Sequence, residues 1–124
     1  MKVTVSAFVH PTESIESVER AIKNIFPDAL LRLEKGEKNK LVGTASLQRL
    51  QELLRRQKIR DTARMELLNS KVGDKIEFVL NKQVAYVGKV NFGEDSLGGI
   101  CVSIEAEDVE KLIDWLVSKT EDKR

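Results

Sequence analysis

The hydrophobic positions of this chain change repeatedly between a period of two and a period of three to four, and each change predicts a new element. Residues 2–9 alternate between apolar and polar side chains, which is typical of a strand with one buried face. Residues 12–26 then show helical spacing, with Thr12 or Ser14 as the capping residue. A proline ends this helix, and residues 29–35 predict a second strand, followed by a polar loop.

Two helices are predicted next. From Ser46 the leucines recur at helical spacing, and a second short helix begins near Asp61. Asp61 or Thr62 supplies the side-chain oxygen that a helix start favours. Asp61 therefore has a structural interpretation as a cap, with Arg64 reaching back to it or to a carbonyl in the preceding turn.

The last third predicts a hairpin, a third strand and a helix. Residues 76–80 and 84–92 form the hairpin strands, and the residues between them form the reversal. Asn81 can take the left-handed conformation of a tight turn, which leaves Lys82 at the tip, free for solvent or a partner. A glycine-rich turn leads to a strand at residues 100–106, and the final helix begins at about Asp108.

This order predicts an α+β two-layer sandwich: an antiparallel or mixed sheet with its helices on one face. Residues 1–117 form one domain, and residues 118–124 form a charged tail that we expect to be disordered. Polar side chains should cover the opposite sheet face. They are Thr4, Ser6, Glu77, Lys89, Asn91, Ser103 and Glu105.

Composition excludes several classes of protein. With 124 residues, 41% of them hydrophobic and 33% charged, the chain can fill one core and is not disordered as a whole. The lone Cys101 cannot form an internal disulfide, and the first residues do not resemble a signal peptide, so a cytoplasmic location is expected. No apolar run is long enough to span a bilayer, which excludes a membrane-embedded role.

Residue chemistry gives little support for catalysis. His10 is the only histidine, and Cys101 lies in a predicted strand without a predicted partner, so a structural role is favoured for both. No metal-ligand spacing occurs, and the glycine-rich turn joins two strands instead of opening a helix. The sequence therefore predicts no catalytic residues, metal or cofactor.

Charge is segregated within a chain whose net charge is only +1. Residues 46–71 hold seven cations against three anions, whereas residues 107–124 hold six anions against four cations. Arg49, Arg56 and Arg60 fall on one ridge of a continuous helix, where they could align along a phosphate backbone. An ordinary solvated helix face is the alternative interpretation.

Two short stretches carry a family resemblance. The sequence Ile-Arg-Asp-Thr-Ala-Arg at residues 59–64 and Leu-Asn-Lys-Gln-Val-Ala at residues 80–85, followed by Gly88, resemble an archaeal family of uncharacterised proteins. The members of this family are described as RNA-binding and as predicted exosome subunits. The sequences His-Pro-Thr-Glu at residues 10–13 and Phe-Pro at 26–27 are also similar. The resemblance implies a ribosomal-protein-like α+β fold.

Charge and resemblance together predict a non-catalytic protein that contacts the phosphates and riboses of structured RNA, because few aromatics are present for base stacking. The expected RNA contacts are Arg49, Arg56, Lys58, Arg60, Arg64, Lys82 and Gln83, and the structural residues of the signature are Asp61, Thr62 and Asn81. The alternative is a protein-interaction module, either a homodimer or an accessory subunit of an RNA-processing assembly, that uses Trp115 and a strand edge. A small hydrolase or nuclease is the third alternative.

Overall fold

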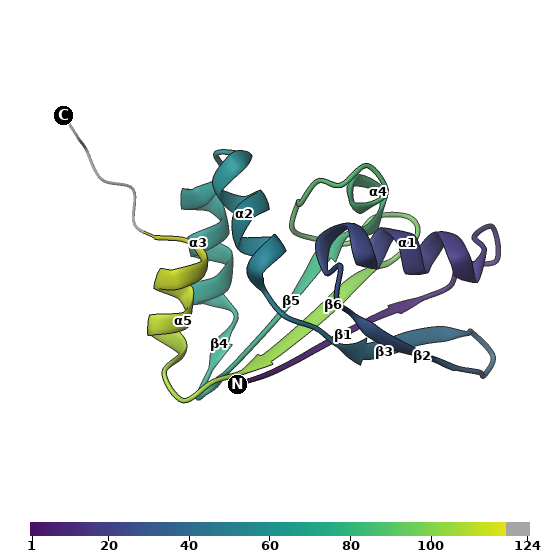
Figure 1. Cartoon of the computed structure of the whole chain (residues 1–124), viewed down its shortest axis with the longest axis horizontal. Coiled ribbons are helices and arrows are strands. Elements are labelled where there is room, and N and C mark those ends of the chain that lie inside the picture. The colour runs from purple at the N-terminus through teal and green to yellow at the C-terminus, as the bar shows by residue number, and fades with distance from the viewer. Residues whose placement is uncertain (119–124) are drawn as a thin grey trace.

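The computed structural model describes residues 1–118, which form one six-stranded antiparallel sheet with five helices packed against it (Figure 1). The strands are β1 (Lys2–Phe8), β2 (Leu30–Glu34), β3 (Lys40–Thr44), β4 (Lys71–Val72), β5 (Lys75–Asn81) and β6 (Gly99–Glu105). The helices are α1 (Ile15–Ile25), α2 (Gln48–Arg56), α3 (Arg60–Asn69), α4 (Lys82–Ala85) and α5 (Val109–Leu116). The order of strands in the sheet is β2-β3-β1-β6-β5-β4.

The alternation of side chains decides which sheet face is buried. Val5 of β1 is opposite Val102 of β6, which in turn is opposite Phe78 of β5, and all three side chains are buried. On the other face, Ser6 is opposite Cys101, and these side chains are not buried. The helices lie on the buried side only (Figure 1), which confirms the predicted α+β sandwich.

The helices form two groups over that face. Helices α1 and α4 contact each other at one end of the sheet, and α5 contacts both α2 and α3 at the other end (Figure 1). Of the two predicted caps of α1, Ser14 is the one that forms, since its side chain accepts a hydrogen bond from the backbone N–H of Ser17. Within residues 1–118, no helix combines the length and the apolar character needed to cross a bilayer.

The predicted strand at residues 84–92 is wrong. Helix α4 follows β5 directly, and an isolated bridge between Leu80 and Phe92 is the pairing that this segment makes with β5. Asn81 has extended backbone angles, φ −65° and ψ 123°, and its side chain accepts a hydrogen bond from the N–H of Val84. It therefore caps a helix instead of forming a left-handed turn, and Lys89 and Asn91 lie in a loop instead of on the open sheet face.

The structure also differs from the predictions for two strands and for the start of α3, and it describes only the first residue of the predicted tail. Strands β3 and β4 were not predicted, because β3 follows the charged hairpin loop closely and β4 has only two residues. Helix α3 begins at Arg60 after Ile59 as its capping residue, without a side-chain cap, so neither Asp61 nor Thr62 caps it. Of the predicted tail, Ser118 is described, and residues 119–124 lie outside the described part of the chain.

Candidate nucleic-acid interface

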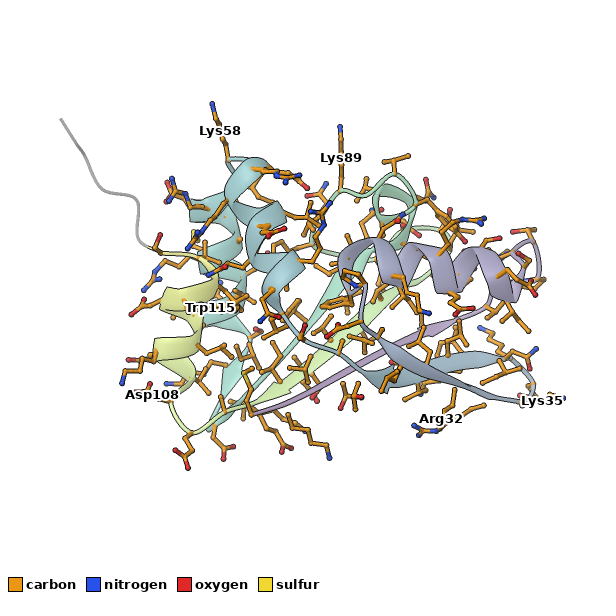
Figure 2. The ribbon with its side chains drawn as sticks, in the orientation of Figure 1. Arg32, Lys35, Lys58, Lys89, Asp108 and Trp115 are labelled. Carbon is orange, nitrogen blue, oxygen red and sulfur yellow. The ribbon has the colours of Figure 1, made fainter. Side chains whose placement is uncertain are left out.

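The turn between α2 and α3 presents a group of cations. The leucines of α2 face the core, which turns Arg55 and Arg56 outward, and both are exposed. Lys58 follows the end of α2 with a left-handed φ of 57°, a conformation that commonly ends helices but is uncommon for a residue other than glycine. Its side chain extends away from the body of the molecule (Figure 2). Arg55, Arg56 and Lys58 have no ion-pair partner among residues 1–118.

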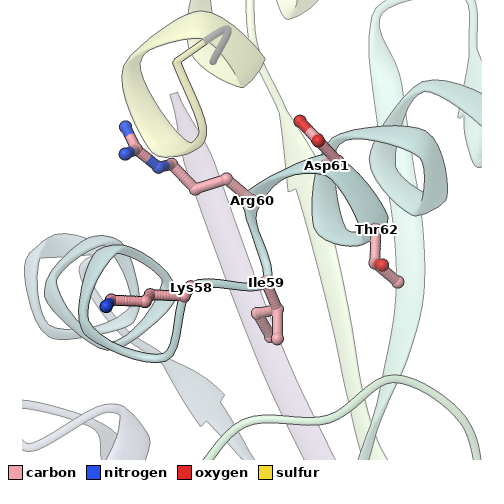
Figure 3. Close-up of a pocket in the computed structure, with 5 residues that line it drawn as sticks. All are labelled: Lys58, Ile59, Arg60, Asp61 and Thr62. Atoms are coloured by element: carbon pink, nitrogen blue, oxygen red, sulfur yellow. The ribbon is translucent and has the colours of Figure 1, made fainter. Parts of the chain in front are cut away.

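The same turn lines an open hollow. Lys58, Ile59, Arg60, Asp61 and Thr62 surround a volume of about 510 Å³ (Figure 3). The side chains of Lys58 and Arg60 extend to one side of the turn. Arg60 is half-buried and its guanidinium donates one long hydrogen bond, 3.4 Å, to the hydroxyl of Ser118. The hollow therefore has two cationic side chains, Lys58 and Arg60, on one side.

A side-chain amide fixes this turn to a distant loop. The Nε2 of Gln57 donates to the carbonyl of Val90 at 2.8 Å, and the Oε1 of Gln57 accepts from the N–H of Val90 at 2.7 Å. This pair of hydrogen bonds holds Lys58 and Lys89, the chain neighbours of the bonded residues, along the same edge of the helical layer (Figure 2). We call Arg55, Arg56, Lys58, Arg60 and Lys89 the basic edge.

Two arginines that were predicted as RNA contacts are paired within the protein. Arg49 forms an ion pair with Glu52 at 3.1 Å, one helical turn away. Arg64 does not reach back to Asp61; its guanidinium contacts the carboxylate of Asp114 at 2.6 Å and donates to the carbonyl of Val117 at 2.9 Å. The predicted ridge of Arg49, Arg56 and Arg60 does not form, because α2 ends at Arg56 and α3 begins at Arg60. Arg64 joins α3 to the end of α5.

Lys82 does not lie at an exposed tip, so the expectation that it is free for a partner is wrong. Its side chain is fully buried, with 0% of its surface exposed. The ammonium donates to the carbonyls of Phe8 at 2.6 Å and Leu97 at 2.8 Å, and to the Oε1 of Glu13 at 3.0 Å. An ammonium has three donors, so this set of acceptors satisfies it completely.

The acceptor Glu13 is nearly as buried as Lys82, since 5% of its side chain is exposed. Its carboxylate also accepts hydrogen bonds from the N–H of His10 at 2.8 Å and from the hydroxyl of Tyr86 at 2.6 Å. Burial by itself favours the neutral acid, but the hydrogen bonds from Tyr86, His10 and Lys82 outweigh it and lower the pKa of Glu13. Burial, followed by the bond to Glu13, raises the pKa of the Tyr86 phenol.

Gln83 lies on the surface but has a structural role. Its backbone N–H donates to the carboxylate of Asp95 at 2.7 Å, and its side-chain amide donates to the hydroxyl of Ser96 at 3.0 Å. Asp95 also accepts from the N–H of Leu97 at 2.8 Å. Because Leu97 supplies a carbonyl to Lys82, Gln83 and Asp95 help to complete the shell around the buried ammonium.

Comparison with known protein families shows which family this chain belongs to. A family described as RNA binding matches residues 2–108. The chain belongs to this RNA-binding family. A UPF0201 protein of Pyrococcus horikoshii is 46% identical over 127 residues, which cover 98% of this chain and 92% of that protein. The crystal structure of a UPF0201 protein from Methanococcus jannaschii superposes with a TM-score of 0.93 at 42% identity, covering 98% of this chain and 96% of that one.

More distant structures share the fold as well. The crystal structure of a DUF54 protein from Archaeoglobus fulgidus has a TM-score of 0.70 at 25% identity, covering 92% of each chain. The RNA-binding family is described by a ligand and not by a reaction. Among the described residues, no group of three or more His, Cys, Asp or Glu side chains gathers to hold a metal ion.

Two of the sequences that carry the resemblance to this RNA-binding family, residues 10–13 and 80–85, meet in the interior, whereas residues 59–64 form the turn between α2 and α3 at the surface. Glu13 and Lys82 are 69 residues apart in sequence and form one buried ion pair. His10, which contributes its backbone N–H to Glu13, uses its ring Nδ1 in a hydrogen bond with the hydroxyl of Thr12 at 2.8 Å. These residues therefore hold β1, α4 and the loop at 93–98 together, which is a structural role.

The lowered pKa of Glu13 predicts a pH dependence of stability. The charged carboxylate is favoured in the folded state, so its contribution is fully present above its ordinary pKa of 4.5 and is lost as the pH falls through the depressed folded value. We expect Glu13→Gln to reduce the loss of unfolding free energy between pH 6 and pH 3, measured by urea denaturation. Glu37→Gln, at an exposed carboxylate of the β2–β3 loop, is the control and should keep the wild-type acid dependence. An unchanged acid dependence in Glu13→Gln would contradict the assignment.

Proposed function

We propose that this protein binds structured RNA without catalysing a reaction, and that the basic edge contacts the phosphates and riboses. The observation that carries the proposal is the concentration of unpaired cations along one edge. Arg55, Arg56 and Lys58 have no ion-pair partner among residues 1–118. The hydrogen bonds of Gln57 with Val90 hold the loop that carries Lys89 against the same edge. Family membership supports RNA as the ligand.

Ion pairs outside the basic edge also support the proposal that the edge binds RNA. The acidic side chains of α5 neutralise cations on the neighbouring face: Asp114 pairs with Arg64, and Glu110 pairs with Lys71 at 3.3 Å. Among residues 1–118, Arg60 at the start of α3 and the cations of the α2–α3 turn have no such acidic partner. An exposed cation without an ion-pair partner can bind a phosphate without first breaking a contact within the protein. Its binding releases counterions from the nucleic acid.

The chemistry of the basic edge favours duplex or hairpin RNA over a single strand. The five residues of the edge include no aromatic side chain on which an unpaired base would stack. Arginine offers two parallel donors to the oxygens of one phosphate, and its contacts do not depend on base sequence. Backbone and ribose contacts of this kind recognise the shape of A-form RNA.

Charge reversal at two edge residues tests the proposal. We expect the wild-type protein to bind a fluorescein-labelled RNA hairpin in fluorescence anisotropy, with an affinity that falls steeply as salt rises. Arg56→Glu/Lys58→Glu removes two phosphate contacts, so the slope of log affinity against log salt should decrease by about 2 and the affinity at 0.1 M salt by about tenfold or more.

The matched control is Lys2→Glu/Lys111→Glu, which makes the same change in net charge at two exposed lysines outside the basic edge. We expect this variant to retain a wild-type slope. Equal losses in the two double variants would show that net charge and not the edge governs binding. No binding of the wild-type protein to the hairpin at 50 mM salt would refute the proposed function.

A further inference from the structure

An exposed aromatic ring lies at the end of β1, far from the basic edge. Phe26 and Phe78 are buried in the core and Phe92 is partly buried, whereas 50% of the surface of Phe8 is exposed. The alternation along β1 turns Val3, Val5 and Ala7 toward the helices, so Phe8 projects from the open sheet face. Burial in the core therefore does not account for this phenylalanine.

Two lysines flank the ring. Lys40 of β3 is directly opposite Phe8 in the register, and its ammonium lies 5.3 Å from the ring centroid. The ammonium of Lys38 lies 5.9 Å from the same centroid. Neither lysine has an ion-pair partner among residues 1–118. At a solvent-exposed site such a cation–π contact is weak, so both ammonium groups can turn toward a stronger anionic partner.

A hollow of about 530 Å³ opens beside the ring. It is lined by Phe8, His10, Pro11, Lys38 and the loop at residues 94–98. This volume lies within the range of about 300 to 1,000 Å³ that small-molecule sites occupy. Carboxylates are also nearby. Glu94 and Asp95 line the hollow, and the carboxylate of Asp95 accepts hydrogen bonds from the backbone N–H groups of Gln83 and Leu97. Glu34, opposite Lys40 in the register, is paired with Arg32 at 2.9 Å.

We propose that Phe8, Lys38 and Lys40 form a second nucleic-acid site, which binds an unpaired nucleotide of single-stranded RNA. The base stacks on the exposed part of the Phe8 ring, and the adjoining phosphates contact Lys38 and Lys40. An aromatic surface for a base, next to cations for its phosphates, is the arrangement that binds single strands without dependence on sequence. An acidic peptide would use the cations but would not need the ring.

This site is separate from the basic edge and does not depend on it. Lys35, at the tip of the β2–β3 hairpin that carries Lys38 and Lys40, lies far from both Lys58 and Lys89 (Figure 2). A protein with both sites would hold a helical segment of RNA at the basic edge and a neighbouring single strand at Phe8. Because the two sites use different residues, each can be disabled without the other.

The decisive experiment compares two probes on the full chain. Fluorescence anisotropy is measured with a labelled decamer of uridylates and with a labelled decamer of ribose phosphates that carry no bases. Stacking of one base contributes a factor of about 5 to 150 in affinity. We therefore expect the wild-type protein to bind the uridylate decamer about tenfold more tightly than the decamer without bases.

Variants assign that preference to the ring. Phe8→Ala should abolish it and leave binding to the decamer without bases unchanged, Phe8→Trp should retain it, and Lys38→Ala/Lys40→Ala should weaken binding of both probes. Leu30→Ala, a truncation at another exposed hydrophobic side chain, is the matched control and should behave as wild type. Phe8→Ala is expected to fold, because the ring is half exposed; an unchanged melting temperature checks this.

Equal affinity of the wild-type protein for the two decamers would overturn the second site, as would a normal base preference in Phe8→Ala. The variant Arg56→Glu/Lys58→Glu separates this result from the proposed function. It should lose hairpin affinity but retain the preference for the uridylate decamer. Loss of that preference in the edge variant would place the bound base at the basic edge and would also overturn the assignment to Phe8.

Discussion

Replacement of Lys82 by methionine is expected to lower the free energy of unfolding by about 3 to 5 kcal/mol, because it removes one partner of a buried ion pair. The substitution leaves the carboxylate of Glu13 without its cation in a site where 5% of its surface is exposed. It also leaves the carbonyls of Phe8 and Leu97 without the donor that bonds them at 2.6 and 2.8 Å. Urea denaturation at pH 7 measures the change.

Two further variants separate the charge from the packing. Lys82→Met/Glu13→Gln should lose less stability than the sum of its two single variants, since the neutral amide no longer requires a cation. Lys89→Met removes an exposed lysine from the loop after α4 and should change stability by no more than about 0.5 kcal/mol. If Lys82→Met were as mild as Lys89→Met, the buried ion pair would not be a main support of this end of the fold.

The periodic part of the fold is predictable from sequence because it depends on near neighbours. Alternation in β1, β5 and β6 and the leucine spacing of α2 report directly which side chains face the core. The segment 84–92 shows where this reasoning fails. Its apolar residues suit a strand, but the Asn81 cap and the buried Lys82 place a short helix there, and both depend on contacts outside the segment.

The candidate site also has a part that is predictable from local sequence and a part that depends on distant contacts. The local concentration of cations pointed to the α2–α3 turn, where the structure leaves Arg56 and Lys58 exposed and Arg60 half-buried; that these residues contact RNA stays a prediction. The place of Lys89 could not be predicted, because it follows from hydrogen bonds between Gln57 and Val90, which are 33 residues apart. Nor could the burial of Lys82, whose carboxylate partner lies 69 residues away. The single available signal was the apolar character of Leu80 and Val84 on either side of the Asn-Lys-Gln sequence.

The structure also explains in part why residues 46–71 are basic and residues 107–124 are acidic. Helix α5 carries the acidic side chains Glu110 and Asp114, which pair with Lys71 of β4 and with Arg64 of α3. Part of the apparent basic surface is therefore an internal contact between two helices, and the sequence alone cannot separate that part from the cations left for a ligand. Arg60 and Arg64 lie on the same helix, one turn apart. Arg64 is paired within the protein, whereas Arg60 is one of the cations left for a ligand.

Arg64→Met is expected to lower the free energy of unfolding by about 2 to 3 kcal/mol. Most of this loss comes from the hydrogen bond to the buried carbonyl of Val117, at 2.9 Å, because bonds to charged donors contribute about 1.5 to 3 kcal/mol. The contact with Asp114 adds less, since 58% of that side chain is exposed. The positive charge of Arg64 also lies at the C-terminus of α5, where the helix dipole favours a cation.

Arg60→Met is the matched control and should show the opposite pattern. Arg60 makes one long hydrogen bond to Ser118, so its replacement should change stability by no more than about 0.5 kcal/mol. Hairpin RNA affinity should fall in Arg60→Met and remain unchanged in Arg64→Met at a temperature where both are folded. Equal RNA losses in the two variants would contradict the division, because Arg64 would then contact RNA in spite of its bonds to α5. A loss of stability in Arg64→Met together with a loss of RNA affinity in Arg60→Met would assign Arg64 to the fold and Arg60 to the ligand.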